Sequence, residues 1–341
     1  MRYLLKAYSL RSLLRRVGWS TFFIVAGLGL VVAGLVTGTF PVGLHQLVSA
    51  LSQEGDPHIA LVVMEWRAPR VVAAILAGMA LGMAGALFQT LLRNPLGSPD
   101  IIGFDSGAFT GALLAMLAGA SETMVAGASL GGGLMAGGLV YGLAGFRNKS
   151  TGRIILIGIA VGAFFMALND WIIMSAQLDT ALAAASWKAG SLNGADSTRL
   201  ALAALMLCLL LPAALGCARP LRILELGNDR AASLGENITA TQLKIGVIGL
   251  ALTGMATFVA GPIGFVALIA PRVAHWLLGG ASIPLLASAL FGAMFLLSSD
   301  LAGRLLFLPQ IIPTGAMTAA LGGVYFVLLL WFRRNVKGNA S

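Results

Sequence analysis

Apolar runs about as long as a membrane is thick recur along the whole chain, and short polar, glycine- or proline-containing stretches separate them. A helix that crosses a hydrocarbon layer about 30 Å thick needs about 20 mostly apolar residues. The runs are 17–42, 61–91, 103–120, 124–145, 154–176, 200–217, 241–260, 262–279, 282–303 and 313–332. The pattern predicts an all-α polytopic membrane protein with about ten transmembrane helices, of which the eighth is short and broken by Pro271.

The composition of the 341 residues agrees with this class and excludes two others. Charged residues make up 10% of the chain and apolar residues 58%, whereas a soluble domain carries about 25% charged residues. A soluble enzyme and a disordered chain are both excluded by these values. The 44 glycines suit membrane helices that approach each other closely.

The formal net charge of +9 comes from cations scattered between the apolar runs, without a basic groove of interleaved aromatic residues. Nucleic acid is therefore not expected as a partner. Cytoplasmic loops of membrane proteins are enriched in Lys and Arg. Residues 1–16 are basic, and Arg333-Arg334 follow the last apolar run. With ten helices, this bias places both termini in the cytoplasm.

Motifs for catalysis or for a bound cofactor are absent from the sequence. The two cysteines and three histidines have no metal-ligand spacing, and neither a P-loop nor a GxSxG motif is present. We therefore expect no catalytic residue, no metal site and no cofactor on this chain. We also find no motif by which it could bind and hydrolyse ATP.

Cations that the topology places on the outer side contradict the charge bias: Arg67, Arg70, Lys188, Arg199 and Arg304. Arg67 and Arg70 precede an apolar helix, and Arg304 follows Asp300 by four residues. One interpretation is structural, with arginines that snorkel to the interface or an Asp300–Arg304 pair on one helix face. The other is a positively charged outer rim that receives an acidic partner, because guanidinium binds carboxylate in a bidentate manner.

The longest polar stretch, residues 219–238, is predicted to be cytoplasmic and to form two short amphipathic helices. Three leucines lead to Gly227, which ends the first helix, and Asn228 or Asp229 caps the second. Gly235 then ends the second helix in a left-handed conformation. A plain connection needs only about 2–8 residues. The segment is therefore either a docking surface for a soluble partner or a solvated loop.

Polar side chains inside the apolar runs are candidates for a translocation path: Gln89, Asn169, Asp170 and Gln177. An ionisable group within a membrane helix is a functional hypothesis by default, although Asp170 paired within the helix packing is the structural alternative. An ion-coupled secondary transporter would need paired carboxylates or unwound ion sites, and only Asp170 lies deep in a run. The loop 92–103 and the stretch 261–264 predict non-helical backbone, which membrane depth tolerates only inside protein or along a cavity.

Four motifs occur in order along the chain: Arg67-Ala-Pro-Arg70, Arg93-Asn-Pro-Leu96, Leu226-Gly227 through Leu234-Gly235, and Gly261-Pro-Ile-Gly-Phe-Val-Ala-Leu-Ile-Ala-Pro271. Pro313-Thr-Gly315 and Leu321-Gly-Gly323 follow near the carboxyl end. By this ordered set the chain resembles, over about residues 20–335, the FecCD-type iron-chelate (ferric siderophore) ABC transporter permeases, a group that includes the vitamin B12 permease.

Within this group, three stretches are similar to FepG-type permease subunits of ferric enterobactin importers: Asn94–Phe104, Trp187–Gly194 and Gly322–Tyr325. The chain departs from the common pattern at Gln310, where many relatives have Glu, and at Arg272, where many have His. A role that depends on that Glu or His is therefore not carried over to this chain.

The resemblance implies a type II ABC importer permease fold in the bacterial inner (plasma) membrane. It divides the chain into a cytoplasmic basic segment 1–16, a transmembrane permease domain 17–332 with a cytoplasmic coupling segment 219–238, and a cytoplasmic tail 333–341. The implied partners are a related permease subunit in a heterodimer, two ATPase subunits that hold ATP and Mg, a periplasmic siderophore-binding protein and membrane lipid. The implied cargo is a ferric siderophore, a catecholate like enterobactin, with vitamin B12 or haem as the alternative.

The resemblance also assigns roles to residues. Arg67, Arg70 and Arg304 match outer arginines that dock the binding protein. The residues that match the ATPase coupling helices are Leu224, Leu226, Gly227, Asp229, Leu234 and Gly235. For the path, the Asp170 carboxylate would repel an anionic ferric catecholate, which argues against that candidate.

Overall fold

The computed structural model describes residues 2–52, 54–145, 151–279, 283–307 and 309–338. Predictions that concern Met1, the loop cations Arg147 and Lys149, and tail residues 339–341 lie outside these ranges. The helices are α1 (Arg2–Val36), α2 (Leu44–Leu51), α3 (Pro57–Leu61), α4 (Ala68–Leu91), α5 (Phe104–Leu117), α6 (Glu122–Ala144), α7 (Thr151–Ser175), α8 (Leu178–Lys188), α9 (Ser197–Gly216), α10 (Ala218–Glu225), α11 (Asn228–Ser233), α12 (Ile238–Ala260), α13 (Val266–Leu278), α14 (Leu285–Leu305) and α15 (Thr314–Gly338), with a π-helical turn η1 (Val62–Arg67) and a 3₁₀ turn η2 (Pro99–Ile102).

Among the described residues, six helices are long and apolar enough to cross a membrane: Pro57–Leu91, Glu122–Ala144, Gly152–Ser175, Ser197–Gly216, Ile238–Ala260 and Leu285–Leu305. Shorter apolar helices cover Thr21–Val36, Phe104–Leu117, Val266–Leu278 and Thr314–Leu329. Each predicted apolar run overlaps one of these helices, so the all-α polytopic class is confirmed. The number of crossings stays a prediction, because the shorter helices are less than a full span.

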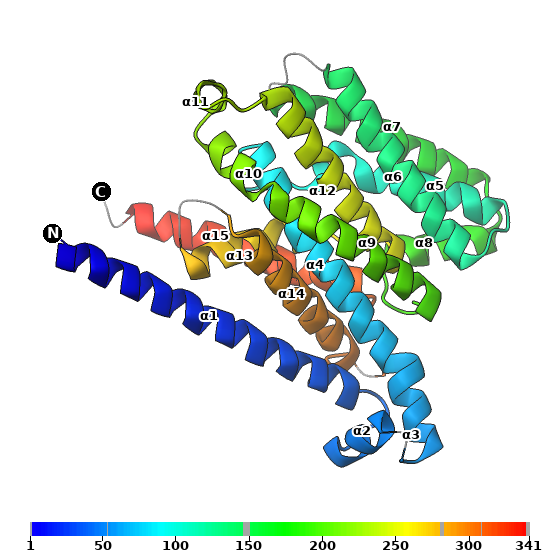
Figure 1. The fold of residues 1–341 in the computed structure, drawn as a ribbon. Helices are drawn as coiled ribbons and strands as arrows, with labels where there is room; N and C mark the ends of the chain where they lie inside the picture. The colour runs from blue at the N-terminus through cyan, green and yellow to red at the C-terminus, as the bar shows by residue number, and fades with distance from the viewer. Residues whose placement is uncertain (1, 53, 146–150, 280–282, 308, 339–341) are drawn as a thin grey trace.

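The bundle has two distinguishable ends (Figure 1). The amino-terminal end of α1, the carboxyl-terminal end of α15, and the short helices α10 and α11 lie at one end, and α2 and α3 lie at the other. The positive-inside interpretation makes the first of these ends cytoplasmic. The first helix is longer than expected toward the amino end and shorter at its outer end, because α1 includes residues 2–16 and stops at Val36 rather than at residue 42.

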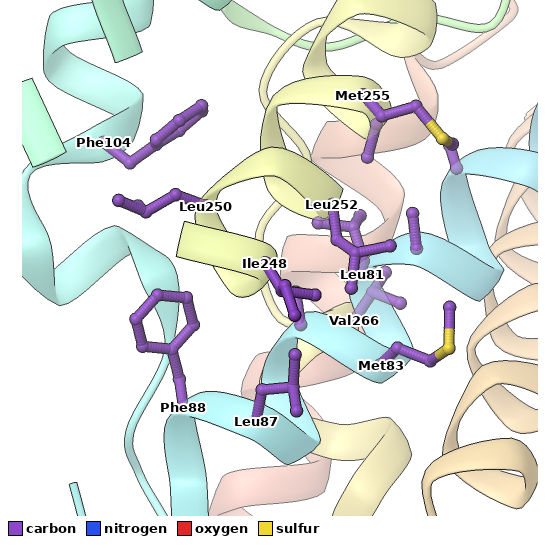
Figure 2. Close-up of a cluster of buried hydrophobic side chains, with 14 of the residues drawn as sticks. Leu81, Met83, Leu87, Phe88, Phe104, Ile248, Leu250, Leu252, Met255 and Val266 are labelled. Atoms are coloured by element: carbon purple, nitrogen blue, oxygen red, sulfur yellow. The ribbon is translucent and has the colours of Figure 1, made fainter. Parts of the chain in front are cut away.

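Helix α4 forms the centre of the bundle and packs against α12, α13 and α14. Figure 2 shows Leu81, Met83 and Leu87 of α4 beside Ile248 and Leu252 of α12. These side chains are at most 8% exposed, so they belong to the main hydrophobic core. Lipid is as apolar as these side chains, so close packing rather than exclusion of water stabilises the contact.

Three glycines on one face of α4 let neighbouring helices approach its backbone. A Cβ at Gly78 would overlap the backbone of Gly292, and a Cβ at Gly82 would overlap the carbonyl oxygen of Ser288, both on α14. A Cβ at Gly85 would overlap the backbone of α13 at Ala267. The spacing of four and three residues keeps these positions on one face, and it is the small-residue spacing typical of close membrane helix pairs.

Replacing Gly82 with valine is expected to push α14 away from α4. The obstacle is backbone rather than a movable side chain, and overpacking a tight contact costs about 1–3 kcal/mol or more. The thermal midpoint of the purified protein should fall by several degrees. The matched control is Gly138→Val on α6, where nothing lies within 4 Å of an added Cβ. Equal midpoints for the two variants would contradict the close approach.

Non-helical backbone reaches membrane depth at two places, as the sequence predicts. Gly103 has φ +73° and packs against Gly162 of α7. At a rise of about 1.5 Å per residue, Gly162 lies about 16 Å along α7 from the first residue of that helix. Helix α5 therefore begins inside the bundle. The stretch between α12 and α13 also lies inside: Phe265 has φ +68° and its side chain abuts Gly322 of α15.

The segment after helix α8 is hydrogen-bonded to two other places where one helix ends or the next begins. The Ser191 N–H donates to the Ala260 carbonyl at the end of α12 (2.9 Å), and the Gly315 N–H at the start of α15 donates to the Gly190 carbonyl (3.0 Å). Because α8 follows the outer end of α7 and ends beside the end of α12, it runs back into the bundle. Its last residue, Lys188, is thereby carried inward from the outer surface.

Candidate functional site

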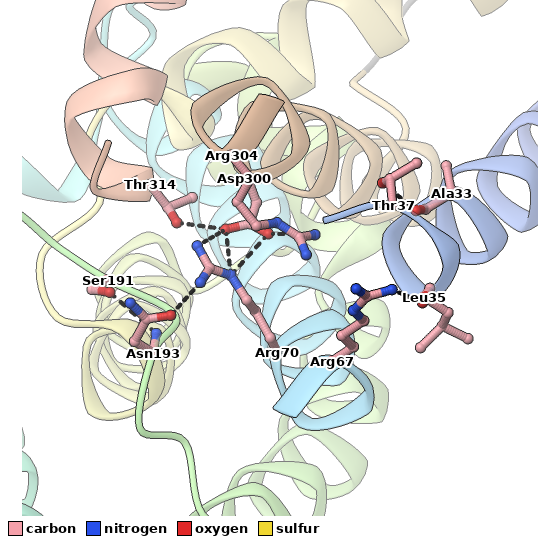
Figure 3. Close-up of polar contacts among 10 residues, drawn as sticks. All are labelled: Ala33, Leu35, Thr37, Arg67, Arg70, Ser191, Asn193, Asp300, Arg304 and Thr314. Atoms are coloured by element: carbon pink, nitrogen blue, oxygen red, sulfur yellow. Dashed lines mark hydrogen bonds and ion pairs between the residues drawn. The ribbon is translucent and has the colours of Figure 1, made fainter. Parts of the chain in front are cut away.

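Arg70, Asp300 and Arg304 form one ionic cluster near the outer end of the bundle (Figure 3). The Asp300 carboxylate accepts hydrogen bonds from Arg70 Nη2 at 2.7 Å, from Arg70 Nε at 2.9 Å and from Thr314 Oγ1 at 2.8 Å. Arg304 Nη2 lies 3.0 Å from the second carboxylate oxygen. Arg70 also donates through Nη1 to the Asn193 side chain. Side chains of α4, α14 and α15 thus meet at one carboxylate, and Arg70 extends the cluster to the segment after α8.

Arg67 has a different set of partners. Its Nη1 donates to the carbonyl oxygens of Leu35 and Val36 at 2.8 Å each, and its Nη2 donates to the carbonyl oxygen of Phe40. The last carbonyls of a helix have no intrahelical donor. Arg67 supplies donors to the end of α1, and it holds that end against the start of α4 (Figure 3).

The interpretation of Arg67, Arg70 and Arg304 as a positively charged outer rim stays a prediction, and the structure shows that the three side chains have little exposed surface. The three residues are only 7%, 9% and 8% exposed, because each guanidinium is directed at an acceptor within this chain. The alternative that sequence spacing offered, an Asp300–Arg304 pair one helical turn apart, is confirmed. Docking of a binding protein by these arginines stays a prediction, and it would require an acidic partner to compete with the intramolecular acceptors.

The coupling segment has the two short helices that its sequence predicts, α10 and α11. Leu221 and Leu224 are buried, at 5% and 2% exposure, whereas Leu226 and Leu234 are 51% and 62% exposed. The segment therefore anchors itself with two leucines and presents two others. An exposed apolar pair on a short helix hairpin suits a contact with another protein.

Both glycines of the coupling segment have positive φ, +106° at Gly227 and +86° at Gly235. The prediction that Gly227 ends the first helix and Gly235 the second is confirmed. The prediction that Asn228 or Asp229 caps the second helix is wrong, because Gly227 occupies the N-cap position and no side chain caps it. The exposed Asp229 is in the first turn, where a carboxylate interacts favourably with the helix dipole.

The Arg93-Asn-Pro-Leu96 motif contacts the coupling segment. Arg93 donates through Nη2 to the Asn228 side chain, and Arg93 has φ +46°, an uncommon conformation for a residue other than glycine. The two motifs are far apart in the sequence, and the structure brings them together at the end of the bundle where α10 and α11 lie, which links the segment after α4 to α11.

The candidate path residues fall into different surroundings. Gln89 is 2% exposed and donates through Nε2 to the carbonyl oxygens of Leu268 (3.0 Å) and Ala267 (3.3 Å). Pro271 has no N–H, so it leaves the carbonyl four residues earlier, at Ala267, without its helical donor. Gln89 therefore stabilises α13 across its proline, and α13 continues through Pro271 rather than breaking there.

Asn169 lies at a buried contact between α7 and α5. Its Oδ1 accepts from Thr110 Oγ1 at 2.7 Å, and its Nδ2 donates to the Ser106 carbonyl at 3.0 Å. Asp170, by contrast, lies on the exposed face of α7, and among the described residues none forms an ion pair with it. Gln177 is exposed and occupies the N-cap of α8 without a capping hydrogen bond.

A cavity of about 370 Å³ opens between α5, α7, α8 and α15, and Asn169 is the one path candidate among its lining residues. Sequence reasoning missed Asp105, Ser106, Phe109 and Lys188, which line it too. Lys188 was placed outside because its loop follows an outward-running helix. The signal that could have found it is the 23-residue interval, residues 177–199, between the runs 154–176 and 200–217, which is long enough for a helix that re-enters the bundle.

Comparison with known proteins agrees with this architecture. The FecCD transport family matches residues 24–332. The ferric enterobactin transport system permease protein FepG of Escherichia coli (strain K12) is 43% identical over 298 residues, which cover 87% of this chain and 90% of FepG. The Fe(3+) dicitrate transport system permease protein FecD of the same organism is 34% identical, covering 91% of this chain and 96% of FecD.

Similarity extends to Bacillus subtilis (strain 168), whose iron-uptake system permease protein FeuC is 34% identical over 90% of this chain and 94% of its own length. A solved structure described as the inward-facing conformation of a metal-chelate type ABC transporter has a TM-score of 0.82 and 25% identity, covering 91% of this chain and 98% of its own. The fold is therefore that of an ABC transporter permease. On the family match and these full-length relatives together, the chain belongs to the FecCD transport family.

Proposed function

We propose that this chain is a permease subunit of an ABC importer that moves a ferric siderophore, a catecholate of the enterobactin type, across the bacterial inner membrane. The observation that carries the proposal is the 43% identity with FepG across nearly the whole chain. Relatives that carry dicitrate or hydroxamate complexes of iron are 33–34% identical. The ferric chelate class is common to all of them, and the catecholate is the narrower part of the proposal.

The transport cycle needs partners that this chain does not supply. We place ATP and Mg on two separate ATPase subunits, which contact the exposed Leu226 and Leu234 at the cytoplasmic end. A periplasmic siderophore-binding protein delivers the cargo at the outer end, near the three arginines Arg67, Arg70 and Arg304. This chain binds no cofactor in the cycle, and both of its termini are in the cytoplasm.

The exposed face of α7 supports a second permease subunit as the remaining partner. Phe164, Trp171 and Met174 are 64%, 67% and 87% exposed, and Asp170 lies among them on the same exposed face. A carboxylate directed at lipid in the middle of a span is costly, so such residues normally face protein or a water-filled cavity. We assign this face to a related permease subunit in a heterodimer.

Coupling follows from helix packing with two discrete arrangements. Closure of the ATPases on ATP moves α10 and α11, and the Arg93–Asn228 contact passes that movement to α4 at the centre of the bundle. Close glycine contacts of α4 with α14 make the packing specific. ATP and the loaded binding protein must each favour one of the two arrangements, because a ligand with equal affinity for both would leave the equilibrium between them unchanged.

Uptake by a deletion strain tests the proposed function. Loss of this chain should abolish uptake of ferric enterobactin, and a plasmid copy should restore it, whereas uptake of vitamin B12 and haem should be unchanged. Loss of vitamin B12 or haem uptake with normal ferric enterobactin uptake would contradict the substrate. Uptake that stops when the proton gradient is collapsed at constant ATP would instead indicate an ion-coupled secondary transporter.

A further inference from the structure

Two cavities meet at a pair of stacked aromatic rings. The cavity of about 370 Å³ is lined by Phe109 of α5, and a cavity of about 460 Å³ nearer the outer end is lined by Trp187 of α8. The two rings stack with centroids 5.8 Å apart and planes 16° from parallel. One ring lines each cavity, so the stacked pair forms a wall between the two.

Lys188 stands beside this wall. Its Nζ lies 5.3 Å from the centroid of the Phe109 ring, its side chain is exposed to the inner cavity that it lines, and within the described part of the chain no carboxylate forms an ion pair with it. An ammonium over an aromatic face gains a favourable electrostatic contact, but its three donors need acceptors. The position has a positive charge, an aromatic face and free donors together.

The acidic residue of the same cavity does not neutralise Lys188. Asp105 is paired with the Asp100 carboxyl, and within the described part of the chain no ion pair joins Asp105 to Lys188.

Four of the residues that line the same cavity are small: Gly264, Gly315, Ala316 and Ala319. Asn169 lines it as well, with its amide held by Ser106 and Thr110. Small residues leave room for a flat ring beside Phe109. A cargo of neutral aliphatic groups would gain nothing from the ammonium.

We propose that Lys188, Phe109 and Trp187 form a subsite on the translocation path that binds the anionic aromatic rings of a ferric catecholate. The inference rests on the proposed function and names the group that recognises its cargo. Three dianionic catecholates outweigh the charge of Fe³⁺, so the complex is an anion with aromatic rings at its surface. Lys188 donates hydrogen bonds to catecholate oxygens while the catecholate rings pack on the aromatic wall. Both contacts are non-covalent, so the cargo can leave the subsite again.

The test uses the complete complex, with the partner permease and the ATPases, in lipid nanodiscs. Ferric enterobactin is titrated against wild type, Lys188→Gln, Lys188→Arg and Lys244→Gln, with quenching of tryptophan fluorescence as the binding signal. Lys188→Gln should raise Kd about tenfold, which corresponds to about 1.4 kcal/mol. Lys188→Arg keeps the charge and stacks on aromatic rings, so it should stay within about threefold. Lys244→Gln removes an exposed cation at the cytoplasmic end and should bind like wild type.

Three results would overturn the subsite. The first is an unchanged Kd of Lys188→Gln for ferric enterobactin, and the second is an equal rise in Kd for Lys244→Gln. The third is a rise in the Kd of Lys188→Gln that is just as large for a neutral ferric hydroxamate, which would indicate that the variant changes the shape of the site rather than its charge. Failure of the proposed function looks different, because wild type itself would then neither bind nor import ferric enterobactin. Wild-type import together with full import by Lys188→Gln would reject the subsite alone.

Discussion

Replacing Asp300 with alanine is expected to destabilise the protein more than any other single change to a charged group that we describe. Asp300 is 1% exposed and is the common partner of Arg70, Arg304 and Thr314. Removing one partner from a buried ionic group costs about 3–5 kcal/mol, because the remaining charges stay buried without compensation. The thermal midpoint of the purified complex should fall by many degrees, and the yield of folded protein should fall with it.

The matched control is Asp229→Ala, which removes an exposed carboxylate from α11 and should leave the midpoint within a degree or two. The comparison also separates the two interpretations of the arginines. If Arg70 and Arg304 serve mainly to dock an acidic binding protein, removal of Asp300 would free them, and association with that protein would become faster at low salt. A stable Asp300→Ala variant that binds the binding protein more tightly would contradict the structural role.

The sequence was sufficient to select the unusual arginines but not to find their partner. The charge bias marks Arg67, Arg70 and Arg304 because a cation on the outer side is rare. Spacing on one helix gives the Asp300–Arg304 pair, since residues four apart share a face. The Arg70–Asp300 contact joins residues 230 positions apart, and only the packing of α4 against α14 determines it.

Gln89 and Lys188 illustrate two further limits. Pro271 predicts that the Ala267 carbonyl loses its helical donor, but which side chain replaces that donor depends on how α4 crosses α13. Lys188 follows an outward-running helix, so a topology built from whole spans assigns it to the outer surface. Helix α8 is too short to be recognised as a span, and its return into the bundle is fixed by the Ser191 and Gly315 hydrogen bonds. Segments shorter than a span are therefore where the sequence underdetermines the path.

Replacing Gly235 with tryptophan is expected to weaken engagement of the ATPases, so that stimulated ATP hydrolysis and uptake fall together, without disturbing a membrane span. Gly235 has φ +86° and follows Leu234, the C-cap residue of α11. The Glu236 N–H donates to the Ala231 carbonyl and the Gly235 N–H to the Ala232 carbonyl, each at 3.0 Å. This is the paired hydrogen-bond pattern of a glycine that ends a helix. A side chain in this left-handed conformation costs about 1–2 kcal/mol, so the end of α11 should rearrange.

The rearrangement should show in function rather than in overall stability. No atom lies within 4 Å of an added Cβ at Gly235, so the strain is confined to the backbone and the membrane helices keep their packing. Docking of the loaded binding protein should persist, whereas stimulated ATP hydrolysis and uptake should each fall about tenfold, about 1.4 kcal/mol of coupling. ATPase activity is measured with and without loaded binding protein in reconstituted complexes. Gly235→Asn is the control, because Asn tolerates the left-handed conformation. If Gly235→Trp kept full stimulation and full uptake, α10 and α11 would be an ordinary connection, and the exposed Leu226 and Leu234 would need another partner.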